Sequence, residues 1–479
     1  MAKDYTTYDS PLVSRYAAKA MRELFSPQKK FSTWRRLWLA LAESQHELGL
    51  KQISSDALKQ MRAHLDDINF DVAEAREREV RHDVMSHVHA YGQQAPAAAG
   101  IIHLGATSCY VTDNADLIVM REALVMVREQ LVALCRALAD FAEKNASVAC
   151  LGSTHFQVAQ LVTVGKRATL WLQDVIADYE EIGRVIDDIP LRGVKGTTGT
   201  QASFLNLFDG DHKKVRKLEE MVCKKMGFER AFPVTGQTYP RKWDHHVLST
   251  LSGIGVSLHK FASDMRLLMG QAELEEPFET SQIGSSAMPY KRNPMRSERI
   301  CSLSRHLMSL AESAGNMASQ QWLERTLDDS AIRRVIIPEA FLTADIILST
   351  ANNIAGGIVV NHAVIAGRVA RELPLMASEE IIMECVRRGG DRQHAHEAIR
   401  THSHAVVKAM RETNAPNDLF ARLKSCPEFK GMAAFIDGLN DPEKFVGRAP
   451  DQVMDFLAEV VRPLLKDAGH GRKGDGVSV

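Results

Sequence analysis

A short run near the middle of the chain combines residues that could bind an anion and move a proton. Residues 281–294 read Ser-Gln-Ile-Gly-Ser-Ser-Ala-Met-Pro-Tyr-Lys-Arg-Asn-Pro. Its two prolines exclude a continuous helix and disfavour a strand. Backbone amides around Gly284, the Ser285 hydroxyl and the Lys291 ammonium could together hold a negatively charged group. We interpret the run as a functional loop; the alternative is an ordinary interhelix loop with solvated basic residues.

A histidine elsewhere in the chain could complete an acid–base pair with this loop. His155 follows a Gly-Ser-Thr run and is predicted to stand at the start of a long helix. A histidine placed there could act as a general acid or base. Ser285 has no G-x-S-x-G surroundings, so it is either a nucleophile with His155 or a base that removes a proton from carbon. The second role needs cations and N–H dipoles to stabilise an alkoxide, and Lys291 with the loop amides could supply them.

Further loops and arginines indicate an anionic substrate. Residues 193–201 read Gly-Val-Lys-Gly-Thr-Thr-Gly-Thr-Gln. This is not a Walker A motif, but it could hold a phosphate or carboxylate through hydroxyl and N–H groups. Ser330 is predicted to cap a helix whose N-terminal amides favour an anion. Several arginines precede or follow it, which indicates a substrate with a phosphate and more than one carboxylate: Arg296, Arg299, Arg325, Arg333 and Arg334. The alternative for any single arginine is a solvated ion pair.

Three nearby histidines raise the possibility of a metal site, which the spacing argues against. His87 and His89 are two residues apart, so on a helix they point to different faces. His82 lies outside any H-E-x-x-H pattern. No metal site is predicted.

Long helices must position these residues. Apolar side chains recur every seven residues in several segments, the pattern of an a/d helix seam. The clearest repeats run from Leu117 to Phe141, from Val158 to Ile189 and from Val247 to Leu268, and weaker ones span 298–321 and 329–353. Five such helices predict an elongated bundle. Because their apolar residues exceed one seam, we expect bundles to pack on bundles in a homo-oligomer; the alternative is a single bundle with no chemistry.

The helical pattern changes at both ends of the chain, which predicts an all-α fold with three parts. Residues 1–110 form an N-terminal helical domain with shorter helices, and residues 111–364 form the central long-helix bundle. After Gly367 the heptads stop and the helices shorten, with a break at Gly389-Gly390. Residues 365–479 are therefore predicted as a C-terminal helical domain with a flexible tail from Asp467.

Composition narrows the class of protein. The 479 residues are 45% hydrophobic and 25% charged, as in ordinary globular proteins. A formal net charge of -1 provides no overall attraction to nucleic acid or to an anionic membrane. Seven cysteines without a C-x-x-C pair indicate unpaired thiols in a reducing compartment. No signal segment or membrane-length apolar run is present, so we expect a cytoplasmic protein.

The central loop resembles a known signature. Gly284 to Pro294 is similar to the G-S-S-x-M-P-x-K-x-N loop of the fumarase/aspartase superfamily. Ala287 and the Lys-Arg-Asn-Pro ending resemble the adenylosuccinate lyase family, in its animal-type form. The likeness covers essentially the whole chain, including Ser14-Arg15-Tyr16, Arg81-His82-Asp83, Ala106-Thr107-Ser108, Thr154-His155, the Lys195 loop and Arg325 to Arg334.

This resemblance implies an activity and an assembly. It implies elimination of fumarate from adenylosuccinate, giving AMP. It also implies the same cleavage of the succinyl-carboxamide ribonucleotide of purine synthesis, giving AICAR. It implies three helical domains and a homotetramer with a central helical core, in which loops from three subunits build each active site. No metal or organic cofactor is expected, and neither nucleic acid nor a membrane is expected as a partner.

The resemblance also assigns roles to residues. Ser285 would be the general base on the succinyl carbon and His155 the general acid on the leaving nitrogen. Lys291 and Asn293 would stabilise the doubly charged carboxylate of the carbanion stage, and His82 would assist His155. The remaining residues would contact the phosphate, base or carboxylates: Arg15, Tyr16, Arg81, Asp83, Thr107, Ser108, Gln237, Met288, Arg299, Arg325, Ser330 and Arg334.

Two other functions fit parts of the pattern. Another lyase of the superfamily, above all argininosuccinate lyase, would differ in the leaving group, which an assay with both substrates distinguishes. A non-enzymatic helical scaffold, like the lens crystallins of this superfamily, would keep the fold alone. Intact Ser285, His155 and Lys291 argue against the scaffold.

Overall fold

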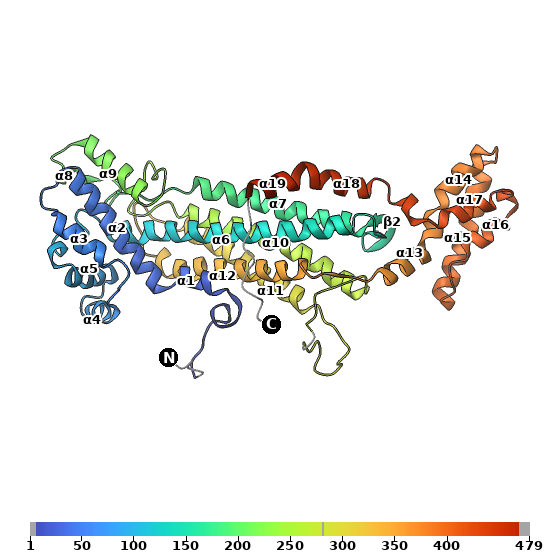
Figure 1. The fold of residues 1–479 in the computed structure, drawn as a ribbon, viewed down its shortest axis with the longest axis horizontal. Coiled ribbons are helices and arrows are strands. Elements are labelled where there is room, and N and C mark those ends of the chain that lie inside the picture. The colour runs from blue at the N-terminus through green and yellow to red at the C-terminus, as the bar shows by residue number, and fades with distance from the viewer. Residues whose placement is uncertain (1–5, 280–281, 469–479) are drawn as a thin grey trace.

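The protein is long and narrow because five long helices lie side by side along it (Figure 1). The computed structural model describes residues 6–279 and 282–468. The predicted all-α long-helix bundle is confirmed, and each of its five helices has 25 residues or more. They are α6 (Ser108–Lys144), α7 (Val164–Asp188), α10 (Lys242–Gly270), α11 (Met295–Ser319) and α12 (Asp329–Ala355).

The heptad positions form the core between these helices. In α6 the leucines of one seam, from Leu117 to Leu138, are at most 1% exposed. α6 packs on α7 and α12, and α10 packs on α7, α11 and α12. Pro338 lies inside α12 without ending it. Burial of such apolar stripes is what stabilises helices of this length.

One predicted long helix begins later than expected. α7 starts at Val164 rather than at Val158, because residues 149–163 form an antiparallel hairpin of β1 (Ala149–Thr154) and β2 (Gln157–Thr163). Leu161 and Thr163 are buried two positions apart, which is the period of a strand. The hydroxyl of Thr163 then caps α7 by accepting the backbone N–H of Lys166 at 3.1 Å. A heptad count that includes Leu161 therefore extends the helix too far.

Shorter helices cover one end of the bundle (Figure 1). The first segment contains a π-helical turn at Leu12–Tyr16. Helix α2 packs on both α6 and α9, so chain segments far apart in sequence meet there. These helices are α1 (Lys19–Leu24), α2 (Pro27–Glu47), α3 (Ser55–Ala63), α4 (Phe70–Val80), α5 (Asp83–Gln94), α8 (Ala202–Leu207) and α9 (His212–Lys225).

A second small core lies at the opposite end (Figure 1). It contains residues of α14 to α17, among them Ile381, Ile399 and Leu419. The last helices then return to the bundle and pack on α6 and α7, with Arg462 paired to Glu143 at 2.7 Å. The bounds are α13 (His362–Met376), α14 (Ser378–Arg387), α15 (Arg392–Thr413), α16 (Leu419–Lys424), α17 (Ala433–Asp437), α18 (Ala449–Phe456) and α19 (Arg462–Ala468).

The predictions about domain boundaries, the C-terminal tail, the cysteines and membrane-spanning helices concern the chain as a whole. The predicted boundaries 1–110, 111–364 and 365–479 stay a prediction. The tail is predicted to be flexible from Asp467, but residues 467 and 468 still belong to the last helix, and from residue 469 on the tail lies outside the described residues. All seven cysteines are free thiols, as predicted. Within the described ranges, no helix combines the length and the apolar character needed to cross a membrane.

Candidate active site

The residues predicted to do chemistry fall into three groups along the bundle. The His82 group lies where α5 meets the start of α6, and includes Ser108, Gln237 and Arg325. The signature-loop group, built around Ser285, lies between α10 and α11. The third group is the hairpin tip, the turn between β1 and β2 that carries His155.

In the His82 group, the histidine ring is oriented from both sides. His82 precedes α5, and its Nδ1 accepts the backbone N–H of Met85 at 3.4 Å. Its Nε2 lies 3.4 Å from the Ser108 hydroxyl, at the first residue of α6. The next residue, Asp83, pairs with Arg334 at 3.6 Å. Two helix N-termini, an imidazole and a guanidinium therefore converge at this end of the bundle, an arrangement suited to anions.

Arg81 and Thr107 lie next to this group in the chain. Arg81 ends α4 in the left-handed region, with φ of 53°. This conformation is uncommon for an arginine and turns the chain sharply into His82. Thr107 stands immediately before α6, but its side chain makes no cap hydrogen bond.

Gln237 lies where its own loop packs, backbone against backbone, on two other loops. Its N–H donates to Glu324 O at 2.9 Å, and its side-chain amide donates to Thr197 O at 3.1 Å. A Cβ on Gly236 would overlap Glu324 O, and a Cβ on Gly199 would overlap Thr235 O. Glycine is therefore required at both close approaches. The loop of residues 193–201 thus supports Gln237 from behind.

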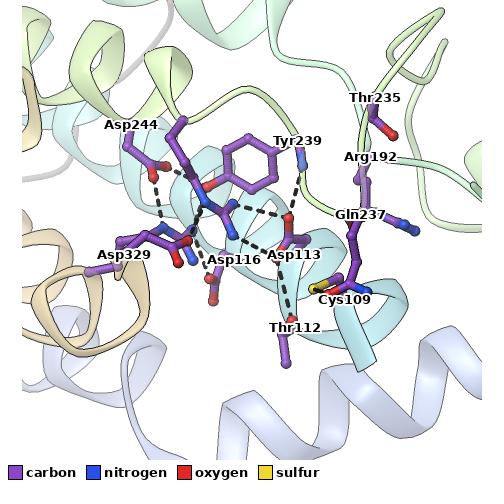
Figure 2. Close-up of polar contacts among 12 residues, drawn as sticks. Cys109, Thr112, Asp113, Asp116, Arg192, Thr235, Gln237, Tyr239, Asp244 and Asp329 are labelled. Atoms are coloured by element: carbon purple, nitrogen blue, oxygen red, sulfur yellow. Dashed lines mark hydrogen bonds and ion pairs between the residues drawn. The ribbon is translucent and has the colours of Figure 1, made fainter. Parts of the chain in front are cut away.

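A buried ion-pair network joins the start of α6 to the starts of α10 and α12, and Tyr239 lies within it (Figure 2). Arg241 makes two hydrogen bonds to Asp113, at 3.0 and 3.1 Å, and a third to Asp329 at 2.6 Å. Asp329 uses its other oxygen to accept from Arg325 at 2.6 Å. Burial alone would raise the pKa of Asp113, but the Arg241 guanidinium lowers it below its ordinary value. Arg325 is therefore oriented from inside the protein.

The second half of the network is centred on Arg333. This guanidinium pairs with Asp244 at 2.7 Å and with Asp116 at 3.0 Å, and it donates to the Tyr239 hydroxyl at 2.5 Å. Tyr239 in turn donates to Asp244. Burial raises the pKa of Tyr239 well above its ordinary value, which keeps the hydroxyl as a donor. By sequence, Arg333 is grouped with the anion-binding arginines. In the structure its guanidinium is already paired with carboxylates of the protein.

The signature loop is neither helix nor strand over residues 282–294, as predicted. It closes on itself at a neck, where Asn293 donates its side-chain N–H to Gly284 O at 2.8 Å. A Cβ on Gly284 would overlap Lys291 O. The Ser285 hydroxyl accepts the backbone N–H of Met288 at 3.1 Å. Lys291 is exposed and lines a hollow of about 560 Å³ against the end of α10.

A basic patch belongs to the same group. The Arg299 guanidinium lies 5.3 Å from the centre of the Tyr16 ring, and that of Arg15 lies 6.0 Å from it. Burial lowers the pKa of Arg299. The turn that carries Arg15 and Tyr16 is held in place by Asp345 of α12, which accepts the N–H of Ala18 at 2.7 Å. These cations gather beside the N-terminus of α11.

His155 stands at the tip of a hairpin, and the prediction that it begins a long helix is wrong. Thr154 pairs with Gln157, so the turn consists of His155 and Phe156 alone. Their φ values are 53° and 59°, the left-handed conformation that two-residue hairpin turns require. Non-glycine residues adopt it at a cost in free energy, and such strain is often found at functional sites. Both side chains are exposed.

One other expectation is corrected. Ser330 does not cap α12: the N-cap position is Asp328, without a side-chain cap bond, and Ser330 lies in the first turn. Lys195 is buried and its ammonium pairs with Glu219 at 2.7 Å; that the loop holds an anion through its hydroxyl and N–H groups stays a prediction. In the part of the chain that the structure describes, no three potential metal ligands converge.

The sequence reasoning missed the buried carboxylates that hold the site. Arg325 and Asp329 are four residues apart, a spacing that favours an ion pair on a helix. Asp113 and Asp116 interrupt the start of an apolar helix, where an uncompensated charge would be costly. Both signals were readable, but neither identifies Arg241 or Arg333 as the partner, since these lie far away in sequence.

Within one chain the groups are far apart. α6 begins at Ser108, beside His82, and ends at Lys144, shortly before the hairpin. A helix of 37 residues spans about 55 Å at 1.5 Å per residue. Figure 1 shows α5 and β2 at opposite ends of the bundle. His82 and His155 of the same chain therefore cannot meet.

Comparison with solved structures defines the class of fold. A fumarate lyase from Mesorhizobium sp. BNC1 is 23% identical and aligns with a TM-score of 0.79, over 93% of this chain and 99% of that chain. A 3-carboxy-cis,cis-muconate lactonizing enzyme from Pseudomonas putida is 22% identical, with a TM-score of 0.81 over 95% and 99%. The fold is that of the fumarate lyases, and residues 16–308 match the family described as "Lyase".

Comparison of sequences narrows the class. Residues 374–456 match the family described as "Adenylosuccinate lyase C-terminus". The adenylosuccinate lyase of Saccharomyces cerevisiae is 54% identical, over 97% of this chain and 96% of the relative. Those of Schizosaccharomyces pombe and Schistosoma mansoni are 49% and 45% identical, with at least 96% of each chain covered. This chain belongs to the adenylosuccinate lyase family.

Proposed function

We propose that this protein eliminates fumarate from adenylosuccinate, giving AMP, and cleaves the succinyl-carboxamide ribonucleotide in the same way, giving AICAR. The observation that carries the proposal is the full-length match to adenylosuccinate lyases, together with an intact signature loop. Each elimination breaks a C–H and a C–N bond and forms the C=C bond of fumarate.

In the proposed mechanism, Ser285 removes the proton and His155 protonates the leaving nitrogen. Removing a proton next to a carboxylate leaves two negative charges on that carboxylate, so charge stabilisation matters more than base strength. Lys291 is exposed at the neck of the loop and can approach such a group. Asn293, now bonded to Gly284 O, would add an N–H donor.

We propose that the site forms between subunits of a homotetramer. Support comes from the length of α6, which separates His82 from His155 in one chain. Apolar side chains that one chain leaves half exposed on the long helices also support it: Leu170, Val256, Leu267 and Val335. Association would bury them. Each site would then combine the His82 group, the signature-loop group and the hairpin tip of three different chains.

The remaining predicted residues are proposed to hold the substrate. In the His82 group, Arg325 and Arg334 would contact carboxylate or phosphate oxygens. The basic patch of Arg15, Tyr16 and Arg299 would contact another acidic group of the substrate. Seven free thiols support a reducing compartment, and we propose that the protein acts in the cytoplasm.

A direct assay tests the proposal. Purified protein is mixed with adenylosuccinate, and the ultraviolet absorbance is followed as AMP and fumarate form. Argininosuccinate is the comparison substrate, since the alternative lyase would cleave it instead. Turnover of argininosuccinate alone, or of neither compound, would contradict the proposed activity.

A further inference from the structure

A short acidic segment joins α10 to the signature loop. Residues 273–276 read Glu-Leu-Glu-Glu, and β3 (Leu274–Glu275) lies within them. β3 pairs with β4 (Val359–Val360). Glu273 and Glu276 are 2% and 6% exposed. Buried carboxylates are costly unless each is paired, so the partners of these glutamates reveal what the segment does.

Glu273 fixes the segment to the rest of the bundle. It pairs with Arg368 of α13 at 2.8 Å and with Arg167 of α7 at 3.6 Å. Arg167 also donates to Leu151 O in β1 at 2.7 Å. The segment therefore has a rigid connection to the hairpin whose tip carries His155.

Glu276 fixes the far side of the signature loop. Its carboxylate accepts the N–H groups of Arg296 and Ser297, at 3.2 and 2.7 Å, and the Ser297 hydroxyl at 2.5 Å. These are the second and third residues of α11, so a negative charge sits at the positive end of that helix. The same helix carries Arg299.

Glu275 then connects this rigid segment to the loop itself. It pairs with Arg292 at 2.7 Å and accepts from the Asn361 side chain at 3.1 Å. The Asn361 hydrogen bond, and after it the Arg292 pair, lower the pKa of Glu275. Arg292 is thereby bound to the protein, whereas its neighbour Lys291 has no carboxylate partner among the described residues. Of the two adjacent cations, Arg292 is therefore bound to Glu275, whereas the Lys291 ammonium is not held by a carboxylate of the described residues.

We infer that Glu275 is a positioning residue for the signature loop: by holding Arg292, it sets where Lys291 and Ser285 stand. Glu273 and Glu276 keep the strand from which Glu275 acts in a fixed place. The inference rests on the proposed function for the roles of Ser285 and Lys291, but the anchoring of the loop can be measured without any activity.

The first test is a double-mutant cycle on the proposed pair. Glu275→Gln, Arg292→Gln and the double variant are compared with the unchanged protein for kcat and KM on adenylosuccinate. A misplaced catalytic group lowers kcat by up to about 100-fold, so we expect kcat to fall by about 10- to 100-fold, with KM changing less. Because the two residues act as one unit, the double variant is no slower than the worse single variant. If instead the kcat losses of the two single variants multiply in the double variant, the proposed pairing is overturned.

The second test reads the loop directly. Trypsin cleaves after Lys291 or Arg292 faster when the loop is less tightly held, and mass spectrometry detects the new ends. Glu275→Gln is expected to be cleaved faster than the unchanged protein, with equal circular dichroism. Glu397→Gln, which removes an exposed partner of Arg400, is the control and should be cleaved at the original rate.

The outcomes separate the inference from the proposed function. Equal cleavage rates for Glu275→Gln and the unchanged protein would overturn the anchoring. Faster cleavage with an unchanged kcat would overturn the positioning role. Absence of adenylosuccinate turnover in the unchanged protein would refute the proposed function, while faster cleavage would still support the anchor.

Discussion

His82 and His155 of one chain lie at opposite ends of α6. Ser108, the first residue of that helix, contacts the His82 ring, and the hairpin that carries His155 follows its last turn. Two histidines separated by the length of this helix, about 55 Å at 1.5 Å per residue, cannot share a proton or a substrate. If both serve one reaction, the protein must work as an assembly, and the predictions below begin from that requirement.

Mixing two inactive variants should restore activity. His82→Ala and His155→Ala proteins are each expected to be inactive, because every site in them lacks one histidine. After subunit exchange in a one-to-one mixture, roughly a quarter of the sites should hold both histidines, by random and independent assembly of subunits. The same calculation applies to His155→Ala mixed with Ser285→Ala. Activity that stays at the single-variant level after confirmed exchange would refute shared sites.

The purified protein should be a tetramer in dilute solution. The long helices leave apolar side chains half exposed, and burying them favours association. Light scattering at micromolar concentration is the measurement. A monomeric mass would contradict both the tetramer and the shared site.

Ser285→Ala should lose nearly all turnover and keep its fold. Loss of a proton-transfer group costs about 10²–10⁴-fold in rate, and among the described residues the serine hydroxyl makes a local contact, with the N–H of Met288. The ultraviolet assay measures turnover, and circular dichroism checks the fold. Ser309→Ala on α11, which removes an exposed hydroxyl bonded to His306 O, is the matched control. Retention of more than about a tenth of the activity would exclude Ser285 as the base.

Arg333→Met should strongly destabilise the protein. The change leaves Asp244 buried without its cation and deprives the Tyr239 hydroxyl of a donor. Removing one partner of a buried pair costs about 3–5 kcal/mol, so the urea midpoint should fall clearly. Arg400→Met breaks an exposed pair with Glu397 and should leave the midpoint unchanged. Equal midpoints for the two variants would show that the network contributes nothing to stability.

Acid should destabilise the protein partly through His103. Burial lowers the pKa of this histidine to about 4, and its Nδ1 accepts from the Trp38 indole at 2.8 Å. An unfolded chain binds the proton near pH 6.5, so between about pH 6.5 and 4 the unfolded state holds more protons and stability falls as pH falls. The contribution is fully present above that range, and its slope reaches about 1.4 kcal/mol per pH unit.

His103→Asn isolates this contribution. Asparagine keeps an acceptor for Trp38 and tolerates the left-handed backbone, since φ is 71° at this position. Urea midpoints measured from pH 7 to pH 4 should fall less steeply in the variant than in the unchanged protein. Parallel curves would mean that His103 is protonated equally in the folded and unfolded states.

The sequence by itself determined the long helices and the residue types of the site. Seven-residue spacing of apolar side chains predicts helices wherever the pattern is long and uninterrupted, because burying one stripe stabilises every turn. The signature loop was equally readable, since prolines and glycine restrict the backbone locally. The pattern failed at residues 158–163, where a short strand satisfies the same spacing.

Only the tertiary structure decided which charged side chains pair with each other and where each group of candidate site residues lies. Arg325 and Arg333 look alike in sequence. In the structure, however, Arg325 pairs with one buried aspartate, whereas Arg333 pairs with two aspartates. Lys291 and Arg292 are adjacent, yet only Arg292 is bound by Glu275. Such pairings join residues distant in sequence, so packing decides them. The physical reason is that hydrophobic spacing acts along one helix, whereas charge pairing depends on which helices meet.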